Sequence, residues 1–390
     1  MHTQEPTGSR ASRHNAGSHL IHGSPNERRR VTVRMGPRWI VNRIAASHPI
    51  LCELRLREAL KRTFPRRLRG LAVPGAQVSL AVGDRPVHTC CFGFARSDTR
   101  DPVNSRTRWR AGSISKPVSA IITACLAARN RLDLDDCLLP DELPPGVPSN
   151  LLVTVRQLLA HRAGLRTTYS PQLSLDTLLA TNQLAIRGEY GTGFIPEFTH
   201  APDASSVYSG GGYMLLQNHL ERRFGDFAAL AREVLFDPLG IRTSTFHPAA
   251  QREPLLVGHD AQGRPLDPVW SPCTAASGLV TTSADLAAIF VQVLRCARGK
   301  TSPLGIPAHL AAEILKPTAP GASFTLGLHL HHGTDANALG HGGFLPGLRS
   351  AVTLIPRIMV VAVGVTNSES GFEVLRNFGG LAHELAAAHT

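Results

Sequence analysis

The sequence is poor in lysine, in aromatic residues and in long apolar runs. Four lysines stand among its 41 basic residues, and aromatic residues make up 5% of the 390. No stretch reaches the roughly 18 apolar residues that a membrane-spanning helix needs. Near the N-terminus, no basic start is followed by the roughly 7–15 apolar residues of a secretory signal. We therefore expect a protein without a transmembrane segment, located in the cytoplasm.

Disulfide and metal patterns are also missing. The seven cysteines are an odd number without a CxxC pair, and the adjacent Cys90 and Cys91 would form a poor structural disulfide. Free thiols in a reducing compartment are the simplest account. No HExxH or similar zinc pattern occurs, and His329, His331 and His332 are expected to be exposed at a strand end rather than to bind a metal. The sequence thus predicts no metal site.

The positive charge is concentrated at one end of the chain. Residues 1–70 hold 15 basic and 4 acidic residues, and so carry +11 of the net charge of +12. Residues 1–46 show no sustained periodicity, which predicts a basic, disordered arm. Such an arm could contact nucleic acid, an anionic membrane or an acidic protein. A solvated tail with arginines set by genome composition is the simpler interpretation, so no nucleic-acid partner is expected beyond weak contacts of the arm.

Patterns of apolar residues predict strands towards both ends of the chain and helices between them. An amphipathic helix is expected over 50–68, ended by Pro65. Strands are expected over 76–82, 88–93, 324–329, 349–355 and 358–365. Helices are expected over 113–129, 155–160, 173–180, 212–223, 227–236 and about 372–388.

This order predicts an α/β (α+β) fold, in which an antiparallel sheet is flanked by helices and carries an inserted, mostly helical domain. Residues 47–125 and 255–390 would form the α/β catalytic domain, and residues 126–254 the helical insert. The chain is long enough for this arrangement, and its 43% of hydrophobic residues can supply a substantial core.

Ser113 and Lys116 form the first candidate constellation, in the segment RAGSISK. At positions i and i+3 of a helix they share one face, with Cβ atoms about 5–6 Å apart. A neutral lysine amine could take the serine proton, and a helix N-terminus directs free N–H groups at the reacting carbonyl. SxxK alone is a weak pattern, and the alternative is a surface serine and lysine that stand three apart by chance.

Two further segments carry candidate chemistry. Tyr208 opens the glycine-rich segment YSGGGY, where a phenol could serve as a base if a cation lies beside it; the alternative, expected for Tyr213, is ring packing with a hydrogen-bonded hydroxyl. In GHGGFLPG, His341 could bind a carboxylate or assist proton transfer. The glycines there let a strand edge approach a ligand with exposed N–H groups, whereas the alternative is an ordinary glycine turn.

Taken together, the order and spacing of these three motifs are more specific than any one of them alone. SxxK, a tyrosine 95 residues after its serine and His-x-Gly a further 133 residues on together resemble the active-site motifs of the serine β-lactamase and penicillin-binding-protein superfamily. Within that superfamily, the motifs most resemble those of class C β-lactamases, D-Ala-D-Ala carboxypeptidases and related esterases. Three more segments are similar to stretches of that family: VTVRQLLAHRAGL (153–165), DPLGI (237–241) and AASGLVTTSADL (275–286).

The resemblance implies a β-lactamase/transpeptidase-like fold and two-step acyl transfer without a metal or organic cofactor. It implies that Ser113 attacks the carbonyl while Lys116 and Tyr208 share the proton relay. The remaining residues that it implies for oxyanion and substrate binding are His341, Gly343, Phe344 and Gly210. One departure is Tyr208-Ser209-Gly210 in place of the Tyr-x-Asn of β-lactamases, because glycine cannot hydrogen-bond the substrate amide as asparagine does.

The sequence is compatible with three functions. The leading hypothesis is a serine hydrolase that acts through an acyl-enzyme on esters or small amides and peptides, with little β-lactamase activity. An acyltransferase of a biosynthetic pathway would use the same acyl-enzyme and differ in the second nucleophile. A non-catalytic penicillin-binding or sensor protein is the third, and the intact trio of Ser113, Lys116 and Tyr208 argues against it.

Overall fold

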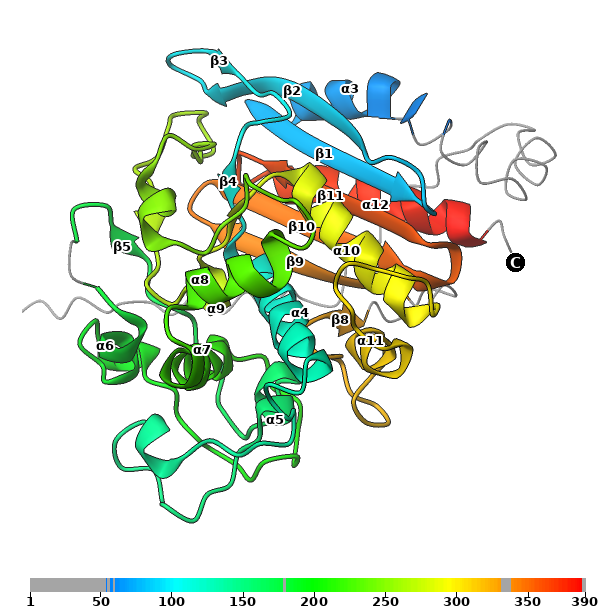
Figure 1. Ribbon diagram of the computed structural model, residues 1–390. Coiled ribbons are helices and arrows are strands. Elements are labelled where there is room, and N and C mark those ends of the chain that lie inside the picture. Colours follow the sequence, from blue (N-terminus) through cyan, green and yellow to red (C-terminus); the bar gives the residue numbers. More distant parts are fainter. Residues whose placement is uncertain (1–53, 55–56, 59, 178–179, 331–337, 388–390) are drawn as a thin grey trace, which may run out of the picture. The chain divides into compact units, whose positions relative to one another are not determined.

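The computed structural model describes residues 54–387, apart from 55–56, 59, 178–179 and 331–337 (Figure 1). The predicted arm at residues 1–46 lies outside the described residues. Within the described chain, no helix is both long and apolar enough to cross a lipid bilayer.

Strands from both ends of the chain form one antiparallel sheet, as predicted. In the described part of the chain the sheet has seven strands in the order β3-β2-β1-β11-β10-β9-β8. The strands are β1 (Gly75–Val82), β2 (His88–Arg96), β3 (Asp101–Pro102), β8 (His329–Leu330), β9 (Leu339–Leu345), β10 (Leu348–Ile355) and β11 (Val360–Thr366). Pairing of β1 with β11 joins the two ends at the centre of the sheet.

Helices and short strands make up most of the remaining elements. The longer helices are α4 (Ser115–Ala128), α7 (Gly210–Phe224), α10 (Ser283–Ala297), α11 (Ala308–Leu315) and α12 (Gly371–Ala387). Shorter ones are α3 (Phe64–Gly70), α5 (Val155–Leu159), α6 (Asn182–Ile186), α8 (Phe227–Ala231), α9 (Thr274–Ser277) and a π-helical turn at Arg232–Phe236. Single 3-10 turns lie at Gly112–Ile114, Pro140–Glu142, Thr192–Phe194, Pro248–Arg252 and Pro356–Ile358. Two strand pairs lie outside the sheet: β4 (Trp109–Arg110) with β7 (Val280–Thr281), and β5 (Leu173–Ser174) with β6 (Val269–Trp270).

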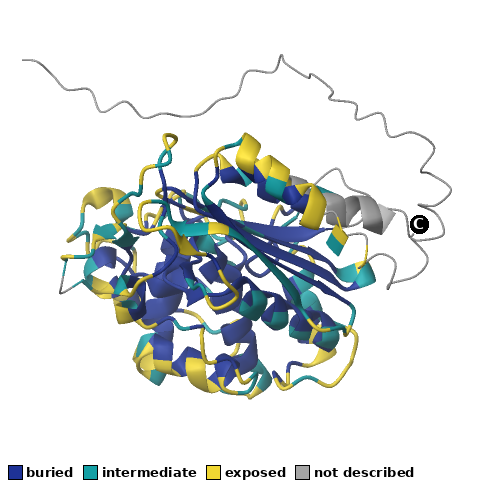
Figure 2. Ribbon diagram, turned by 90° about the horizontal axis from the view of Figure 1, so that it is seen from above, coloured by how far each residue is buried: buried dark blue, intermediate teal, exposed yellow. Residues whose placement is uncertain are grey.

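Helices cover both faces of the sheet, which explains why its central strands are buried. Strands β1 and β11 are buried along their whole length and are mostly apolar, as strands covered on both faces are, although β1 also buries Gln77 and Ser79 (Figure 2). On one face, Val78 and Val360 pack with Phe64 of α3 and Phe378 of α12. The other face joins a larger core that includes α10 and α4. Each buried aliphatic or aromatic side chain contributes about 1.5–3 kcal/mol to this packing.

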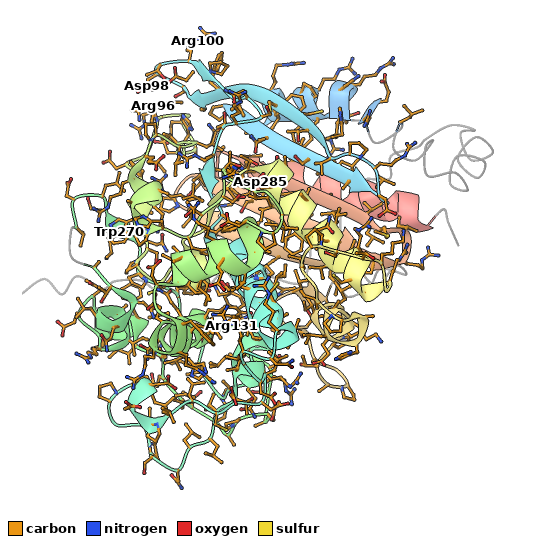
Figure 3. All side chains as sticks on the ribbon, in the orientation of Figure 1. Arg96, Asp98, Arg100, Arg131, Trp270 and Asp285 are labelled. Atoms are coloured by element: carbon orange, nitrogen blue, oxygen red, sulfur yellow. The ribbon has the colours of Figure 1, made fainter. Side chains whose placement is uncertain are left out.

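Three sequence predictions were wrong in detail. The helix expected over 50–68 is broken at Thr63, and Pro65 stands in the first turn of the second helix, α3, where its missing N–H has no partner to lose. The helix expected over 173–180 is replaced at its start by β5, because tertiary pairing with β6 overrides local propensity. The indole of Trp270, labelled in Figure 3, donates to the Ser174 carbonyl at 3.0 Å and fixes this pairing.

The strand expected over 324–329 is instead a tight turn. Phe324 and His329 pair across it as an isolated bridge, and Gly327 takes a φ of +92° inside it. A Cβ at Gly327 would lie 3.0 Å from the Tyr213 hydroxyl, so the turn packs directly on α7. The turn carries His329 to the start of β8, beside the motif residues described next. The predicted boundaries of the helical insert stay a prediction.

Candidate active site

Ser113 lies in a 3-10 turn that leads straight into α4. Gly112 before it has a φ of +54°, a conformation that suits glycine, and so turns the chain sharply from β4 into the helix. The hydroxyl of Ser115 donates to the Gly112 carbonyl at 2.7 Å and accepts from the Leu279 N–H at 3.0 Å. Ser113 itself is half-buried and lies at the start of a buried helix.

Lys116 lies one turn further on and is 2% exposed. Its Nζ donates to Ser113 Oγ at 3.2 Å and to the Ala276 carbonyl at 2.9 Å. Nζ also lies over two aromatic rings, 5.1 Å from the ring centroid of Tyr208 and 5.8 Å from that of Tyr213. Among the ion pairs of the described residues, none involves this lysine. The amine is therefore held by a carbonyl, a hydroxyl and two aromatic rings.

Tyr208 stands two residues before α7, and Ser209 is the N-cap of that helix. The structure thus brings the three predicted residues Ser113, Lys116 and Tyr208 together from two helix starts that are 95 residues apart. Tyr213 behaves as the packing tyrosine that was expected, since it is fully buried and its hydroxyl donates to the Leu159 carbonyl at 3.0 Å.

Three histidine rings surround the Tyr208 phenol. The ring centroids of His161, His329 and His341 lie 4.8, 5.7 and 5.9 Å from that of Tyr208. The prediction that His329 is an exposed strand-end residue was wrong, because it is half-buried and its ring lies 4.8 Å from that of His341. His331 and His332 lie outside the described residues. Within the described chain no set of His, Cys, Asp and Glu residues is arranged to hold a metal ion.

Hydrogen bonds assign the tautomers of two of these rings. His161 and His341 are both buried, and burial, followed by the nearby Lys116 and His329, holds the pKa of each imidazole well below its usual range. Nδ1 of His341 lies 2.8 Å from the Gly342 carbonyl and must donate, so its Nε2 is a lone-pair acceptor. Nδ1 of His161 accepts from the Ser209 N–H at 3.2 Å, so its Nε2 carries the proton. Neither Nε2 has a partner among the described residues.

These buried neutral rings predict a pH-dependent stability. Because the folded pKa of each ring is depressed, the unfolded chain binds more protons below pH about 6.5, and stability falls as the pH falls from there. Each ring contributes a slope of up to about 1.4 kcal/mol per pH unit. Urea unfolding between about pH 7 and pH 5 measures the slope, which His341→Asn should reduce and His309→Asn, at an exposed position, should leave unchanged. An equal slope in His341→Asn would contradict the assignment of a neutral buried ring.

Strand β9 brings the third motif against the nucleophile turn. A Cβ placed on Gly112 would lie 3.3 Å from the Phe344 amide nitrogen, so this amide lies beside the residue preceding Ser113. The Ser350 hydroxyl donates to the Ala111 carbonyl at 3.2 Å and ties β10 to the same turn. The motif is therefore a strand edge rather than an ordinary glycine turn. The Phe344 side chain is 55% exposed and packs on Phe372, with ring centroids 5.0 Å apart and ring planes tilted by 47°.

Close approach makes Gly343 sensitive to substitution. A Cβ there would overlap the Ala111 carbonyl oxygen and the Ser350 hydroxyl. Gly343→Ala should push β9 away from the nucleophile turn, lower the free energy of unfolding by about 1–3 kcal/mol and slow acylation. The control is Gly380→Ala in α12, where a Cβ meets open space and should stabilise by about 0.5–1 kcal/mol. Urea unfolding and labelling rates measure both variants, and unchanged acylation in Gly343→Ala would contradict the tight approach.

Gly210 begins α7 rather than lining an open site. Its N–H donates to the Thr168 carbonyl, and a Cβ at this position would lie 2.7 Å from that carbonyl oxygen. The segment 168–170 therefore occupies the place that a side chain of residue 210 would need. The hydroxyls of Ser170 and Ser277 lie 2.7 Å apart, which fixes this segment next to the carbonyl that holds Lys116.

Sequence reasoning missed His161 as a residue of the site. It stands in the segment 153–165, which resembles a stretch of the family, and no periodicity in the sequence places it beside Tyr208, 47 positions away. A histidine directly after a short helix, in a segment without another role, was the one available signal.

Comparison with known proteins identifies the family of this chain. A family model described as Beta-lactamase matches residues 60–384. The chain therefore belongs to the beta-lactamase family, and its mixed fold with an antiparallel sheet flanked by helices is the fold of that family.

Particular relatives show how far the likeness extends. Esterase EstB of Burkholderia gladioli is 28% identical over 218 residues, which are 53% of this chain and 56% of that protein. The chain thus aligns with little more than half the length of this curated relative. The crystal structure of SurE is 26% identical with a TM-score of 0.69, over 87% of this chain and 77% of SurE. A D-amino acid amidase from Ochrobactrum anthropi, 21% identical, has a TM-score of 0.68 over 86% of this chain and 98% of its own.

Proposed function

We propose that this protein is a serine hydrolase that cleaves esters and small amides through an acyl-enzyme on Ser113. The observation that carries the proposal is the contact of Lys116 Nζ with Ser113 Oγ at 3.2 Å, under the ring of Tyr208. Membership of the beta-lactamase family and the similarity to an esterase support the same reaction class.

The first step forms an ester between enzyme and substrate. Ser113 Oγ attacks the carbonyl carbon while its proton passes to the relay that Lys116 and Tyr208 form. The carbon–oxygen or carbon–nitrogen bond to the leaving group then breaks, and the leaving group takes a proton from Lys116 or from the Tyr208 hydroxyl. Burial of Lys116 under two rings keeps water from competing for this proton.

Backbone amides would stabilise the charge that develops on the carbonyl oxygen. We assign this role to the N–H groups of Ser113 and Phe344, because the Phe344 amide nitrogen lies close to Gly112. Loss of one such donor costs roughly 3–4 kcal/mol in a well-studied protease. Gly343 acts here by its lack of a side chain, which permits the approach.

The second step releases the acyl group and is where His341 would act. In its neutral tautomer its Nε2 accepts a hydrogen bond, so it suits the Tyr208 hydroxyl or a substrate N–H better than a substrate carboxylate. A water molecule attacks the acyl carbon, and its proton passes to the relay of Lys116 and Tyr208. Oγ of Ser113 then regains a proton as the acid product leaves.

The substrate is expected to be a neutral ester or small amide rather than a penicillin. Gly210 has no side chain with which to hold a substrate amide, and segment 168–170 fills the neighbouring place. His341 is uncharged because burial depresses its pKa. Arg349, whose guanidinium lies 5.4 Å from the Phe344 ring centroid, is engaged by Glu369 at 3.3 Å and by two backbone carbonyls. Efficient β-lactam hydrolysis is therefore not expected.

Intact-mass spectrometry tests the proposal. The protein is exposed to p-nitrophenyl esters, D-amino-acid amides and penicillins, and an adduct equal to the acyl group is expected with the esters. Product analysis with an added amine or alcohol separates hydrolysis from transfer to an acceptor, the acyltransferase alternative. Absence of both adduct and turnover with every activated ester would overturn the proposal and favour a non-catalytic binding protein. A cytoplasmic location stays a prediction, which cell fractionation would test.

A further inference from the structure

His161 occupies an unusual backbone position next to the site. It directly follows the C-cap of α5 and has a φ of +57°, a conformation that costs a non-glycine residue roughly 1 kcal/mol or more. It is also 4% exposed. A strained, buried, titratable residue that the mechanism above does not use needs a reason for being there.

His161 contacts the residues on both sides of Tyr208 as well as Tyr208 itself. Its carbonyl oxygen accepts from the Val207 N–H at 2.9 Å, and its Nδ1 accepts from the Ser209 N–H at 3.2 Å. Between these two lies Tyr208, whose ring packs on the imidazole with centroids 4.8 Å apart and planes 42° apart. His161 therefore holds both backbone neighbours of Tyr208 and the face of its phenol.

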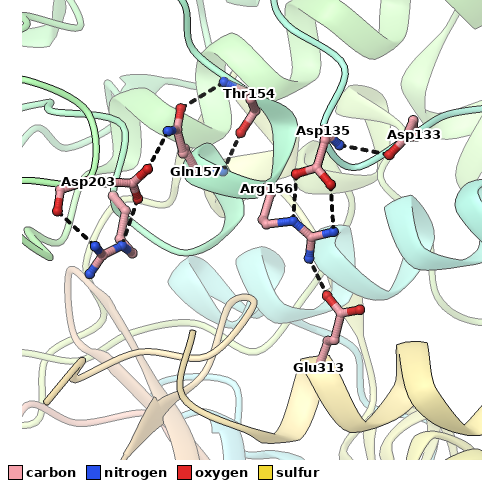
Figure 4. A network of polar contacts seen from close by, with 8 residues as sticks. Asp133, Asp135, Thr154, Arg156, Gln157, Asp203 and Glu313 are labelled. Atoms are coloured by element: carbon pink, nitrogen blue, oxygen red, sulfur yellow. Dashed lines mark hydrogen bonds and ion pairs between the residues drawn. The ribbon is translucent and has the colours of Figure 1, made fainter. Parts of the chain in front are cut away.

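A polar network fixes the turn that carries His161. At the start of α5, Thr154 and Gln157 form a capping box, and Gln157 donates to Asp203 at 2.7 Å (Figure 4). Arg162, the next residue after His161, donates to Asp203 at 2.9 Å through its side chain. The Arg162 N–H donates to the Gln157 carbonyl at 2.8 Å, which closes the network around the strained residue.

Chemistry argues that this arrangement serves more than packing. The Nε2–H of His161 is buried without a partner among the described residues, and leaving a donor unsatisfied costs about 1–3 kcal/mol. An asparagine could keep the positive φ and accept from Ser209, and a phenylalanine could keep the ring packing. A histidine alone combines the acceptor with the flat ring against Tyr208.

We propose that His161 is a positioning residue that sets the place of the Tyr208 phenol beside Lys116, through its carbonyl oxygen, its Nδ1 and its ring face. This inference rests on the proposed function, since it assumes that the phenol takes part in acylation. His161 itself does not touch the reacting atoms. Its removal should therefore slow acylation only to the extent that Tyr208 is displaced.

The test is the rate at which a fluorophosphonate labels Ser113, with kcat and KM on a p-nitrophenyl ester. His161→Asn, which keeps the backbone conformation and an acceptor, should lower the labelling rate and kcat about 10–100-fold with KM within about threefold, as expected when a proton-transfer group is displaced. In a Tyr208→Phe background the same substitution should cost less than about threefold, because both act through one hydroxyl.

Two controls separate positioning from loss of structure. His219→Gln removes another buried imidazole, one that contacts Glu142 at 2.9 Å instead of Tyr208, and should destabilise the fold yet label at the wild-type rate below its unfolding temperature. Should His161→Asn fail to fold, Asp203→Asn loosens the same turn from an exposed position and should slow labelling several-fold, again only when Tyr208 is present.

The outcomes distinguish the two levels of inference. If the wild-type protein is not labelled at Ser113, the proposed function fails whatever the His161 variants do. If it is labelled and folded His161→Asn or Asp203→Asn labels equally fast, or the loss is the same in the Tyr208→Phe background, the positioning role is overturned.

Discussion

Replacement of Ser113 by alanine should abolish labelling by a fluorophosphonate and reduce ester turnover at least about a thousandfold, because it removes the oxygen that would form the acyl-enzyme. Ser113 is half-exposed at the start of α4, and its Oγ is the atom that Lys116 reaches at 3.2 Å. Removal of this oxygen should leave the fold intact, so we expect the loss to appear entirely in the chemical step.

The measurement is intact mass after exposure to the probe, combined with kcat on a p-nitrophenyl ester. Ser105→Ala, at an exposed position between β3 and β4, is the matched control and should be labelled like the wild type. The unfolding midpoint of Ser113→Ala should stay close to that of the wild-type protein. Labelling that persists in Ser113→Ala at the wild-type rate would place the nucleophile elsewhere and end the proposed mechanism.

The antiparallel sheet could be predicted because its signals are local or follow from chain order. Runs of apolar residues at 76–82 and 358–365 predicted β1 and β11, and the order of strands and helices predicted that both belong to one sheet. Their direct pairing at its centre was not predicted. The predictions failed where a distant partner decides the conformation. Leu173 and Ser174 form a strand only because Val269 and Trp270 lie opposite, a contact across 95 residues that no local pattern contains.

The candidate site was predictable to the extent that motifs encode it. The closeness of Ser113 and Lys116 follows from their i, i+3 spacing on a helix. That the three motifs meet in space was predicted from their order, through the family resemblance. His161 and the fit of Thr168 against Gly210 were not predictable, because both depend on backbone conformations that appear only after folding. A positive φ at a histidine and a carbonyl oxygen that excludes a side chain leave no periodic trace in a sequence.

Tyr208→Phe should lower the rate of acylation by about 10²–10⁴-fold, the usual contribution of a positioned proton-transfer group. The substitution removes one oxygen and keeps the ring that packs on His161 and lies 5.1 Å from Lys116 Nζ. Since the ring contacts remain, the free energy of unfolding should change little. The labelling rate of Ser113 and urea unfolding measure the two effects separately.

Tyr213→Phe is the matched control, because this ring also faces Lys116, at 5.8 Å, while its hydroxyl is committed to the Leu159 carbonyl. Its loss leaves a buried carbonyl without that donor and should cost about 1–3 kcal/mol of stability, with acylation within about threefold of wild type. The two tyrosines should thus give opposite results: a catalytic defect without instability at Tyr208, and instability without a catalytic defect at Tyr213. The reverse pattern would move the proton relay from the start of α7 into its first buried turn, and Ser113 and Lys116 would then act without the phenol at Tyr208.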